Sequence, residues 1–153
     1  SAHANAVVSI DVSGKATALC DENVALNQYT DRHESLTEDV MKWLKTSEDT
    51  YDIVVLDPPA FAKSLSARHR AVQGYKRLNS EGIAKVRPGG LLFTFSCSQV
   101  VDRELFYNTV VAACMEVGRK ARVLHQLTQG PDHPVNAFHP EGSYLKGLVL
   151  RID

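Results

Sequence analysis

The chain has 153 residues, of which 44% are hydrophobic and 23% charged, and its formal net charge is −1. These values suit one globular domain with a hydrophobic core, and we predict a single domain over residues 1–153. No apolar run approaches the roughly 20 residues of a membrane span, so we expect no membrane partner. A net charge close to zero gives no support to nucleic-acid binding, although a local basic patch can be sufficient for such binding.

The three cysteines, Cys20, Cys97 and Cys114, are odd in number and widely spaced. This spacing argues against a disulfide framework and against a C-x-x-C zinc site. We therefore predict no metal and a reducing, cytoplasmic compartment.

The first half of the chain alternates strand and helix patterns. Residues 6–11 form a β-branched run that ends in an acid, and Ser13 can cap a helix over about 15–27. A second helix is predicted over about 37–46. Tyr51–Leu56 (YDIVVL) is nearly continuous in apolar residues, as in a central parallel strand that is covered on both faces.

The second half continues the alternation. Apolar spacing predicts a helix over about 72–86, which Pro88-Gly89-Gly90 ends, and then a strand over 91–95. A helix over 102–118 precedes two late strands, 121–127 and 147–152, which a long loop separates. Alternating strands and helices predict an α/β domain with a mainly parallel sheet.

Three groups of polar residues follow predicted strands, where open parallel sheets bind their ligands. Asp11 occupies the position at which nucleotide-binding folds place an acid on ribose hydroxyls; alternatively it is an acid at a helix entry. Asp57-Pro58-Pro59 forms a stiff loop that can present a carboxylate to a flat base, on which Phe61 could stack. The alternative is an ordinary turn followed by a core phenylalanine.

Cys97 lies between Ser96 and Ser98 at the end of a predicted strand. As a thiolate it could act as a nucleophile, whereas burial is the simpler interpretation of a cysteine taken alone. The position of Cys97 next to the end of the strand that precedes Asp57 favours its interpretation as a nucleophile. Cys20 and Cys114 fall on apolar helix faces and are predicted to be core residues.

Four segments carry a resemblance to a known family: VVSIDVS with ALCDENVALN, YDIVVLDPPAFAKS, GYKRLN with RPGGLLFTFSCSQVV, and GPDHPVNAFHPEGSYLKGLVLRI. Over nearly its whole length, the chain resembles the class I methyltransferase domain of the large-subunit ribosomal RNA cytosine-C5 methyltransferases. The resemblance implies a Rossmann-like three-layer sandwich with an antiparallel last strand. It also implies S-adenosylmethionine as cofactor and RNA, ribosomal RNA in particular, as partner.

The resemblance also implies roles for individual residues. Cys97 would be the nucleophile and Asp57 would contact the target base. Asp11 would hold the ribose of the cofactor and Asp39 would lie near the adenine. The cofactor-binding residues it implies are Asp11, Ser13, Asp39, Asp57 and Pro58, and the substrate-binding residues are Pro59, Phe61, Tyr144 and Lys146.

The tail and one loop are the least specific parts. Tyr144 and Lys146 could contact a base and a phosphate, and Arg68, His69 and Arg70 could add a basic loop on the same side. The alternative for these residues is a surface loop with solvated charges.

The chain departs from the family at its start, because the first strand and its glycine-rich loop should precede Ala2. We expect an N-terminally truncated domain with weak cofactor binding, little activity and possible homodimerisation through the exposed sheet. Other functions stay open: a methyltransferase acting on an amino group of a base without a cysteine nucleophile, an NAD-dependent oxidoreductase, or an inactive module that binds RNA.

Overall fold

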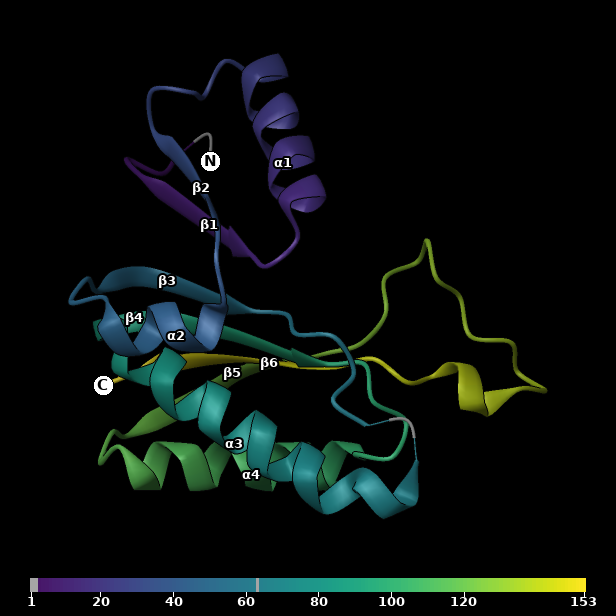
Figure 1. The fold of residues 1–153 in the computed structure, drawn as a ribbon. Helices are drawn as coiled ribbons and strands as arrows, with labels where there is room; N and C mark the ends of the chain where they lie inside the picture. Colours follow the sequence, from purple (N-terminus) through teal and green to yellow (C-terminus); the bar gives the residue numbers. More distant parts are fainter. Residues whose placement is uncertain (1–2, 63) are drawn as a thin grey trace. The chain divides into compact units, whose positions relative to one another are not determined.

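The computed structural model of the chain describes residues 3–62 and 64–153 (Figure 1). By its internal contacts the chain divides into two compact units, Ser1–Ser47 and Glu48–Asp153. Each unit has its own sheet. No helix of the described residues is long and apolar enough to cross a membrane.

The first unit is a parallel strand pair joined by a helix. Its elements are β1 (Val7–Asp11), α1 (Gly14–Leu26), β2 (His33–Thr37) and α2 (Val40–Thr46). The strands β1 and β2 pair in parallel, from Val7 opposite His33 to Asp11 opposite Thr37. The Ser13 hydroxyl caps α1 by accepting a hydrogen bond from Ala16 N at 3.3 Å, as the sequence predicts. The predicted strand over 6–11 and the first helix are thus confirmed.

Strand β2 is absent from the sequence-based prediction, which wrongly begins the second helix at residue 37. Thr37 pairs with Asp11 in the sheet, and α2 begins only at Val40, after Asp39 as its cap. A side-chain hydrogen bond of 3.0 Å joins Ser9 Oγ and His33 Nε2. Strand pairing therefore decides the conformation of this polar segment.

The second unit is a four-stranded sheet with two helices. Its strands run in the order β3 (Tyr51–Leu56), β4 (Val86–Ser96), β6 (Lys146–Ile152), β5 (Ala121–Leu127). Strand β4 is parallel to β3, and β6 is antiparallel to both of its neighbours, β4 and β5. The structure thus confirms a mainly parallel sheet whose last strand is antiparallel.

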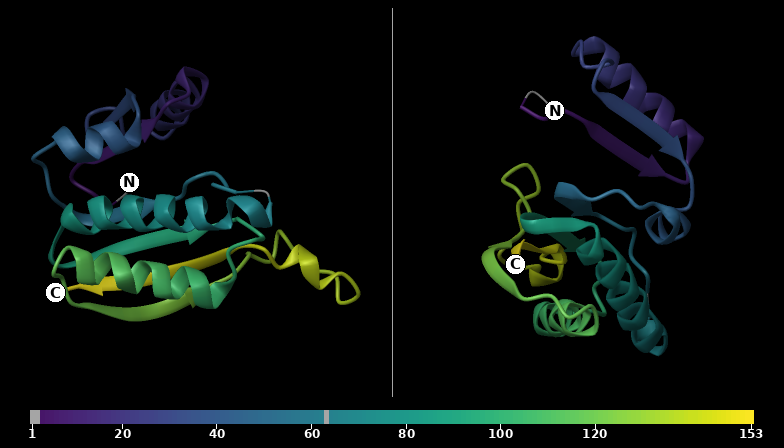
Figure 2. Two further views of the ribbon diagram at one scale, coloured as in Figure 1. Left: turned by 60° about the horizontal axis from the view of Figure 1, so that its bottom comes forward. Right: turned by 90° about the vertical axis from the view of Figure 1, so that its left-hand side faces the viewer.

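Helices α3 (Arg68–Ala84) and α4 (Arg103–Glu116) lie side by side and cover one face of this sheet (Figure 2). Their buried side chains and those of the strands form the core. Its largest fully buried members are Tyr75, Phe106, Ile83, Leu92, Ile152, Val86, Val101 and Val110. Cys114 is buried on α4, as predicted, whereas Cys20 on α1 is only half-buried.

Strand β3 is confirmed as a strand, and its predicted coverage on both faces stays a prediction. Among the described residues it pairs with β4 alone, and its outward side chains Ile53 and Val55 are 57% and 61% exposed. Leu56, whose side chain points to the opposite face of the strand, is buried. Helices of the second unit thus cover one face of β3. Self-association through this sheet stays a prediction.

The Pro88-Gly89-Gly90 segment lies inside β4 and does not end α3, contrary to the prediction. The helix ends earlier, at Ala84, and the pairing of β4 with β3 shifts between Tyr51 and Ile53. A proline fits there because it has no backbone N–H, and the irregular pairing requires no hydrogen bond to β3 from this position. A side chain on Gly90 would have its Cβ 2.7 Å from the Asp52 carbonyl oxygen, so only glycine fits without a shift.

The structure also corrects the prediction of a basic loop over residues 68–70. They form the first turn of α3 and not a basic loop. Arg68 pairs there with Asp102, whose carboxylate lies 3.2 Å from the guanidinium.

A buried hydrogen bond joins the loops that follow β3 and β4. Ser98 Oγ donates to the Ala62 carbonyl oxygen at 2.9 Å, and both residues are buried. The bond fixes the distance between two segments that are 36 positions apart in the chain. It ties together the two loops that carry Asp57 and Cys97.

Replacing Ser98 with alanine leaves the buried Ala62 carbonyl without this donor. We expect the free energy of unfolding to fall by about 1–3 kcal/mol, the cost of a buried unsatisfied acceptor. Urea denaturation of the two proteins measures the change. Ser64→Ala, which removes an exposed hydroxyl that contacts only Ser66 Oγ among the described residues, is the control and should change stability little. Equal changes in the two variants would contradict a structural role for the Ser98 bond.

Candidate functional site

Asp57 and Cys97 come from neighbouring parallel strands of the second unit. Leu56, the last residue of β3, lies opposite Thr94 of β4, so both strands end at the same edge of the sheet. Asp57 follows β3 directly and is exposed; Cys97 follows β4 directly and is half-buried. The structure therefore brings together the two residues predicted to be catalytic.

Tyr75 of α3 lies beneath this pair. Its hydroxyl is buried, and burial raises the pKa of Tyr75, to which Cys97 and Asp57 add smaller electrostatic contributions in the same direction. The hydroxyl lies near Ser96 and the Phe61 carbonyl but makes no hydrogen bond of regular geometry among the described residues. The pairing of Leu56 with Thr94 places the ends of β3 and β4 side by side above this tyrosine.

Phe61 and the two prolines form the exposed part of the loop after β3. The Phe61 ring packs on Tyr75, with ring centroids 4.6 Å apart, yet the residue remains 40% exposed. Pro58 is half-buried and Pro59 is exposed. One part of the Phe61 ring is thus fixed by the core, and the rest is free to meet a flat ligand.

The residues predicted to bind the cofactor at the other strand end lie in the first unit. Asp11 is the last residue of β1, is exposed, and accepts a 2.7 Å hydrogen bond from Ser13 N through Oδ1. Its second oxygen is left for hydroxyl donors, which suits a ribose. Asp39 is exposed and caps α2 by accepting from Lys42 N at 2.8 Å. These carboxylates fit hydroxyl and amine groups of a nucleoside.

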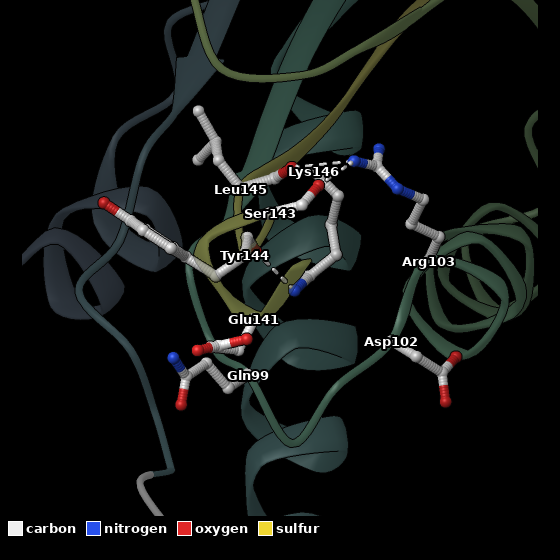
Figure 3. Close-up of a pocket in the computed structure, with 8 residues that line it drawn as sticks. All are labelled: Gln99, Asp102, Arg103, Glu141, Ser143, Tyr144, Leu145 and Lys146. Carbon is white, nitrogen blue, oxygen red and sulfur yellow. Dashed lines mark hydrogen bonds between the residues drawn. The ribbon is translucent and has the colours of Figure 1, made fainter. Parts of the chain in front are cut away.

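Tyr144 and Lys146 lie beside a cavity of about 320 Å³ in the second unit (Figure 3). Lys146 is buried, and its Nζ donates to the Ser98 carbonyl oxygen at 2.6 Å and to the Tyr144 carbonyl oxygen at 2.8 Å. Burial lowers the pKa of Lys146, and the nearby Arg103 lowers it further. Tyr144 is half-buried, and its ring points away from the Lys146 amine.

Sequence reasoning missed three residues that shape this region. Tyr75 is only one apolar position of a predicted helix, and no local pattern distinguishes Arg103 from other charged residues. Ser98 belongs to a predicted motif, but its bond to Ala62 joins segments too distant for a pattern to reveal. Among the described residues, no group of three or more His, Cys, Asp or Glu side chains could hold a metal ion.

Known proteins resemble this chain over almost its whole length. Ribosomal RNA large subunit methyltransferase I of Alteromonas mediterranea is 40% identical over 153 residues, which cover 97% of this chain and 38% of that protein. The protein of the same name from Shewanella amazonensis is 41% identical, covering 99% of this chain and 39% of its own length. The chain thus spans about two fifths of the length of these curated relatives.

Solved structures share the fold. A protein of Streptococcus mutans, described as a SAM-dependent methyltransferase, superposes with a TM-score of 0.81 at 22% identity, covering 97% of this chain and 39% of that one. NSun6 from Pyrococcus horikoshii, solved with SFG, gives a TM-score of 0.67 at 16% identity, covering 95% and 41%. The predicted Rossmann-like methyltransferase fold is thereby confirmed.

Residues 1–89, more than half of the chain, match the family described as conserved hypothetical protein 95. The chain therefore belongs to the conserved hypothetical protein 95 family, within the class I methyltransferase fold.

Proposed function

We propose that the chain is the methyl-transferring domain of an S-adenosylmethionine-dependent RNA methyltransferase. Its target is carbon 5 of a cytosine in large-subunit ribosomal RNA, reached through a covalent adduct with Cys97. The observation that carries the proposal is the placement of Asp57 and Cys97 at the ends of adjacent parallel strands. The names of the relatives that are about 40% identical support ribosomal RNA as the substrate.

Asp11, Ser13 and Asp39 are the proposed cofactor residues of the first unit, and Asp57 and Pro58 those of the second. The free oxygen of Asp11 accepts from the ribose hydroxyls, while its bond to Ser13 N keeps the carboxylate in position. Two solved neighbours with this fold carry SAH and SFG, which supports a cofactor of that chemical class. S-adenosylmethionine supplies the methyl group from a positively charged sulfur.

The thiolate of Cys97 makes carbon 5 of the pyrimidine reactive. Its sulfur forms a bond to carbon 6, which places electron density on carbon 5. With the cofactor bound, carbon 5 would then bond to the methyl group while the methyl–sulfur bond breaks and S-adenosylhomocysteine leaves. A hydrogen bond between the Asp57 carboxyl group and ring nitrogen 3 stabilises the adduct. Removal of the carbon-5 proton by a base restores the double bond as the carbon–sulfur bond breaks and the thiolate leaves.

The exposed groups around this pair supply the proposed contacts with the substrate. Phe61 stacks on the target base, which has left its own stack, and Pro59 borders it. Tyr144 and Lys146 extend the surface toward a neighbouring base and a phosphate. All three cysteines are free thiols, in keeping with the reducing cytoplasm that we propose as the compartment.

The Asp11→Asn substitution tests the cofactor site. The amide oxygen can still accept from Ser13 N, but an amide NH₂ cannot accept from a ribose hydroxyl. We expect the Kd for S-adenosylhomocysteine, measured by calorimetry on the full-length protein, to rise about tenfold. Asp31→Asn, an exposed carboxylate of the same unit, should leave Kd unchanged. Equal Kd values in the two variants would remove Asp11 from the site.

The Cys97→Ala substitution tests the chemistry. The full-length protein receives labelled cofactor and unmodified large-subunit ribosomal RNA, and nucleosides are separated after digestion. We expect label in 5-methylcytosine from the unaltered protein, and a rate lower by about a thousandfold or more in the variant, because a covalent nucleophile is removed. Cys20→Ala, a half-buried thiol of α1, should retain the activity.

Two other results would change the proposal. Label that persists in Cys97→Ala would move the methyl group to an amino nitrogen, since such a transfer needs no thiol. Absence of label from every RNA nucleoside in the unaltered protein would contradict the RNA methyltransferase itself.

A further inference from the structure

Two cations line the 320 Å³ cavity that borders the Cys97 loop (Figure 3). Lys146 begins β6 and pairs in the sheet with Ser96, the residue before Cys97. Arg103 is the first residue of α4, and its guanidinium extends from this helix to Ser143 Oγ and Leu145 O (Figure 3). The cavity also includes Gln99, two positions after Cys97, so it adjoins the proposed catalytic cysteine along the chain.

Lys146 is a buried charge without a carboxylate partner in the described part of the chain. The residue is 6% exposed, and its two hydrogen bonds go to neutral carbonyl groups, those of Ser98 and Tyr144. An ammonium group has three donors, so one remains for a ligand. A buried charge whose hydrogen bonds go only to neutral groups is costly, and an anion in the cavity would offset that cost.

Arg103 likewise has no acidic partner among the described residues. Its guanidinium reaches only neutral oxygens, at 3.3–3.5 Å: Leu145 O, Ser143 Oγ and Leu127 O. These contacts are longer than charge-assisted hydrogen bonds to an anion, which measure about 2.7–2.9 Å. The guanidinium is exposed and can turn from them toward a ligand that carries negative charge.

The two acids of the cavity are engaged elsewhere. Asp102 caps α4 through Leu105 N at 2.8 Å and pairs with Arg68 at 3.2 Å. Glu141 pairs with His139 at 3.0 Å. Among the described residues, neither carboxylate lies within ion-pair distance of Arg103 or Lys146, so neither neutralises these cations by direct contact.

We propose that this cavity binds a backbone phosphate of the substrate RNA, next to the nucleotide that is methylated. Arg103 pairs with the phosphate oxygens through its planar fork, and Lys146 supplies its remaining donor from below. The inference rests on the proposed function, because the RNA must reach Cys97. It adds Arg103 as an RNA-binding residue and gives Lys146 the role of a fixed, buried donor.

The salt dependence of RNA binding tests this site. A fluorescent, single-stranded RNA of mixed sequence is titrated with the full-length protein at several KCl concentrations. Each phosphate contact contributes about 0.7 to the slope of log Kd against log salt concentration for single strands. We expect Arg103→Gln to lower that slope by about 0.7 and to raise Kd about tenfold at low salt. Arg103→Lys should restore most of the slope, because it restores the charge.

Arg77→Gln is the matched control, since Arg77 is an exposed arginine of α3 outside the cavity. It should keep the Kd and the slope of the unaltered protein. Melting temperatures of the variants establish that all remain folded. Identical slopes and Kd values for Arg103→Gln and Arg77→Gln would overturn the phosphate site.

Methyl transfer, measured in the same preparations, separates this inference from the proposed function. Transfer to cytosine without any dependence of Kd or slope on Arg103 overturns the phosphate site and leaves the function intact. An Arg103-dependent slope in a protein that transfers no methyl group supports the phosphate site and contradicts the function.

Discussion

Strands β3 and β4 lie side by side and run in parallel, and the candidate site depends on that pairing. Parallel neighbours end at the same edge of a sheet, so residues that follow them meet although the chain separates them widely. Here the residues are Asp57 and Cys97. The bond from Ser98 to Ala62 then fixes the two loops against each other, and the rings of Phe61 and Tyr75 pack together beneath them at an interplanar angle of 48°.

The sequence predicted most elements of the second unit because their patterns are strong. Tyr51–Leu56 and Ala121–Leu127 are strands with the predicted bounds. The helix predicted over about 102–118 is α4, which spans Arg103–Glu116 after Asp102 as its cap. The apolar run of β3 indicates a strand but does not say which of its faces are covered. The residues of the site were predictable as strand ends, whereas their mutual contacts were not.

The errors have a common physical origin in pairing between distant segments. His33–Thr37 (HESLT) has little apolar character, and becomes a strand because β1 offers it a complete parallel partner. Pro88-Gly89-Gly90 has the composition of a helix stop, yet it lies in β4 where the pairing with β3 is irregular. In both segments, hydrogen bonding to a distant strand overrides the local secondary-structure preference. A local sequence pattern contains no information about that distant partner.

The position of Lys146 shows that overall composition does not indicate where individual charges lie in the folded chain. The chain is nearly neutral overall, and a lysine at a strand start normally extends into solvent. Folding instead buries this ammonium beside Arg103 and behind the Cys97 loop. In the phosphate site that we propose, a small number of positioned charges would bind RNA without a basic composition.

Covalent capture of the adduct tests the central claim most directly. An RNA in which the target cytosine carries fluorine at carbon 5 cannot lose a proton from that carbon, so an adduct with Cys97 stays bonded. We predict that mass spectrometry of the full-length protein, incubated with this RNA and S-adenosylmethionine, finds one RNA bonded to the peptide that contains Cys97. A protein that methylates the unmodified RNA but forms no bond to the fluorinated one, or forms it at another residue, would contradict the account.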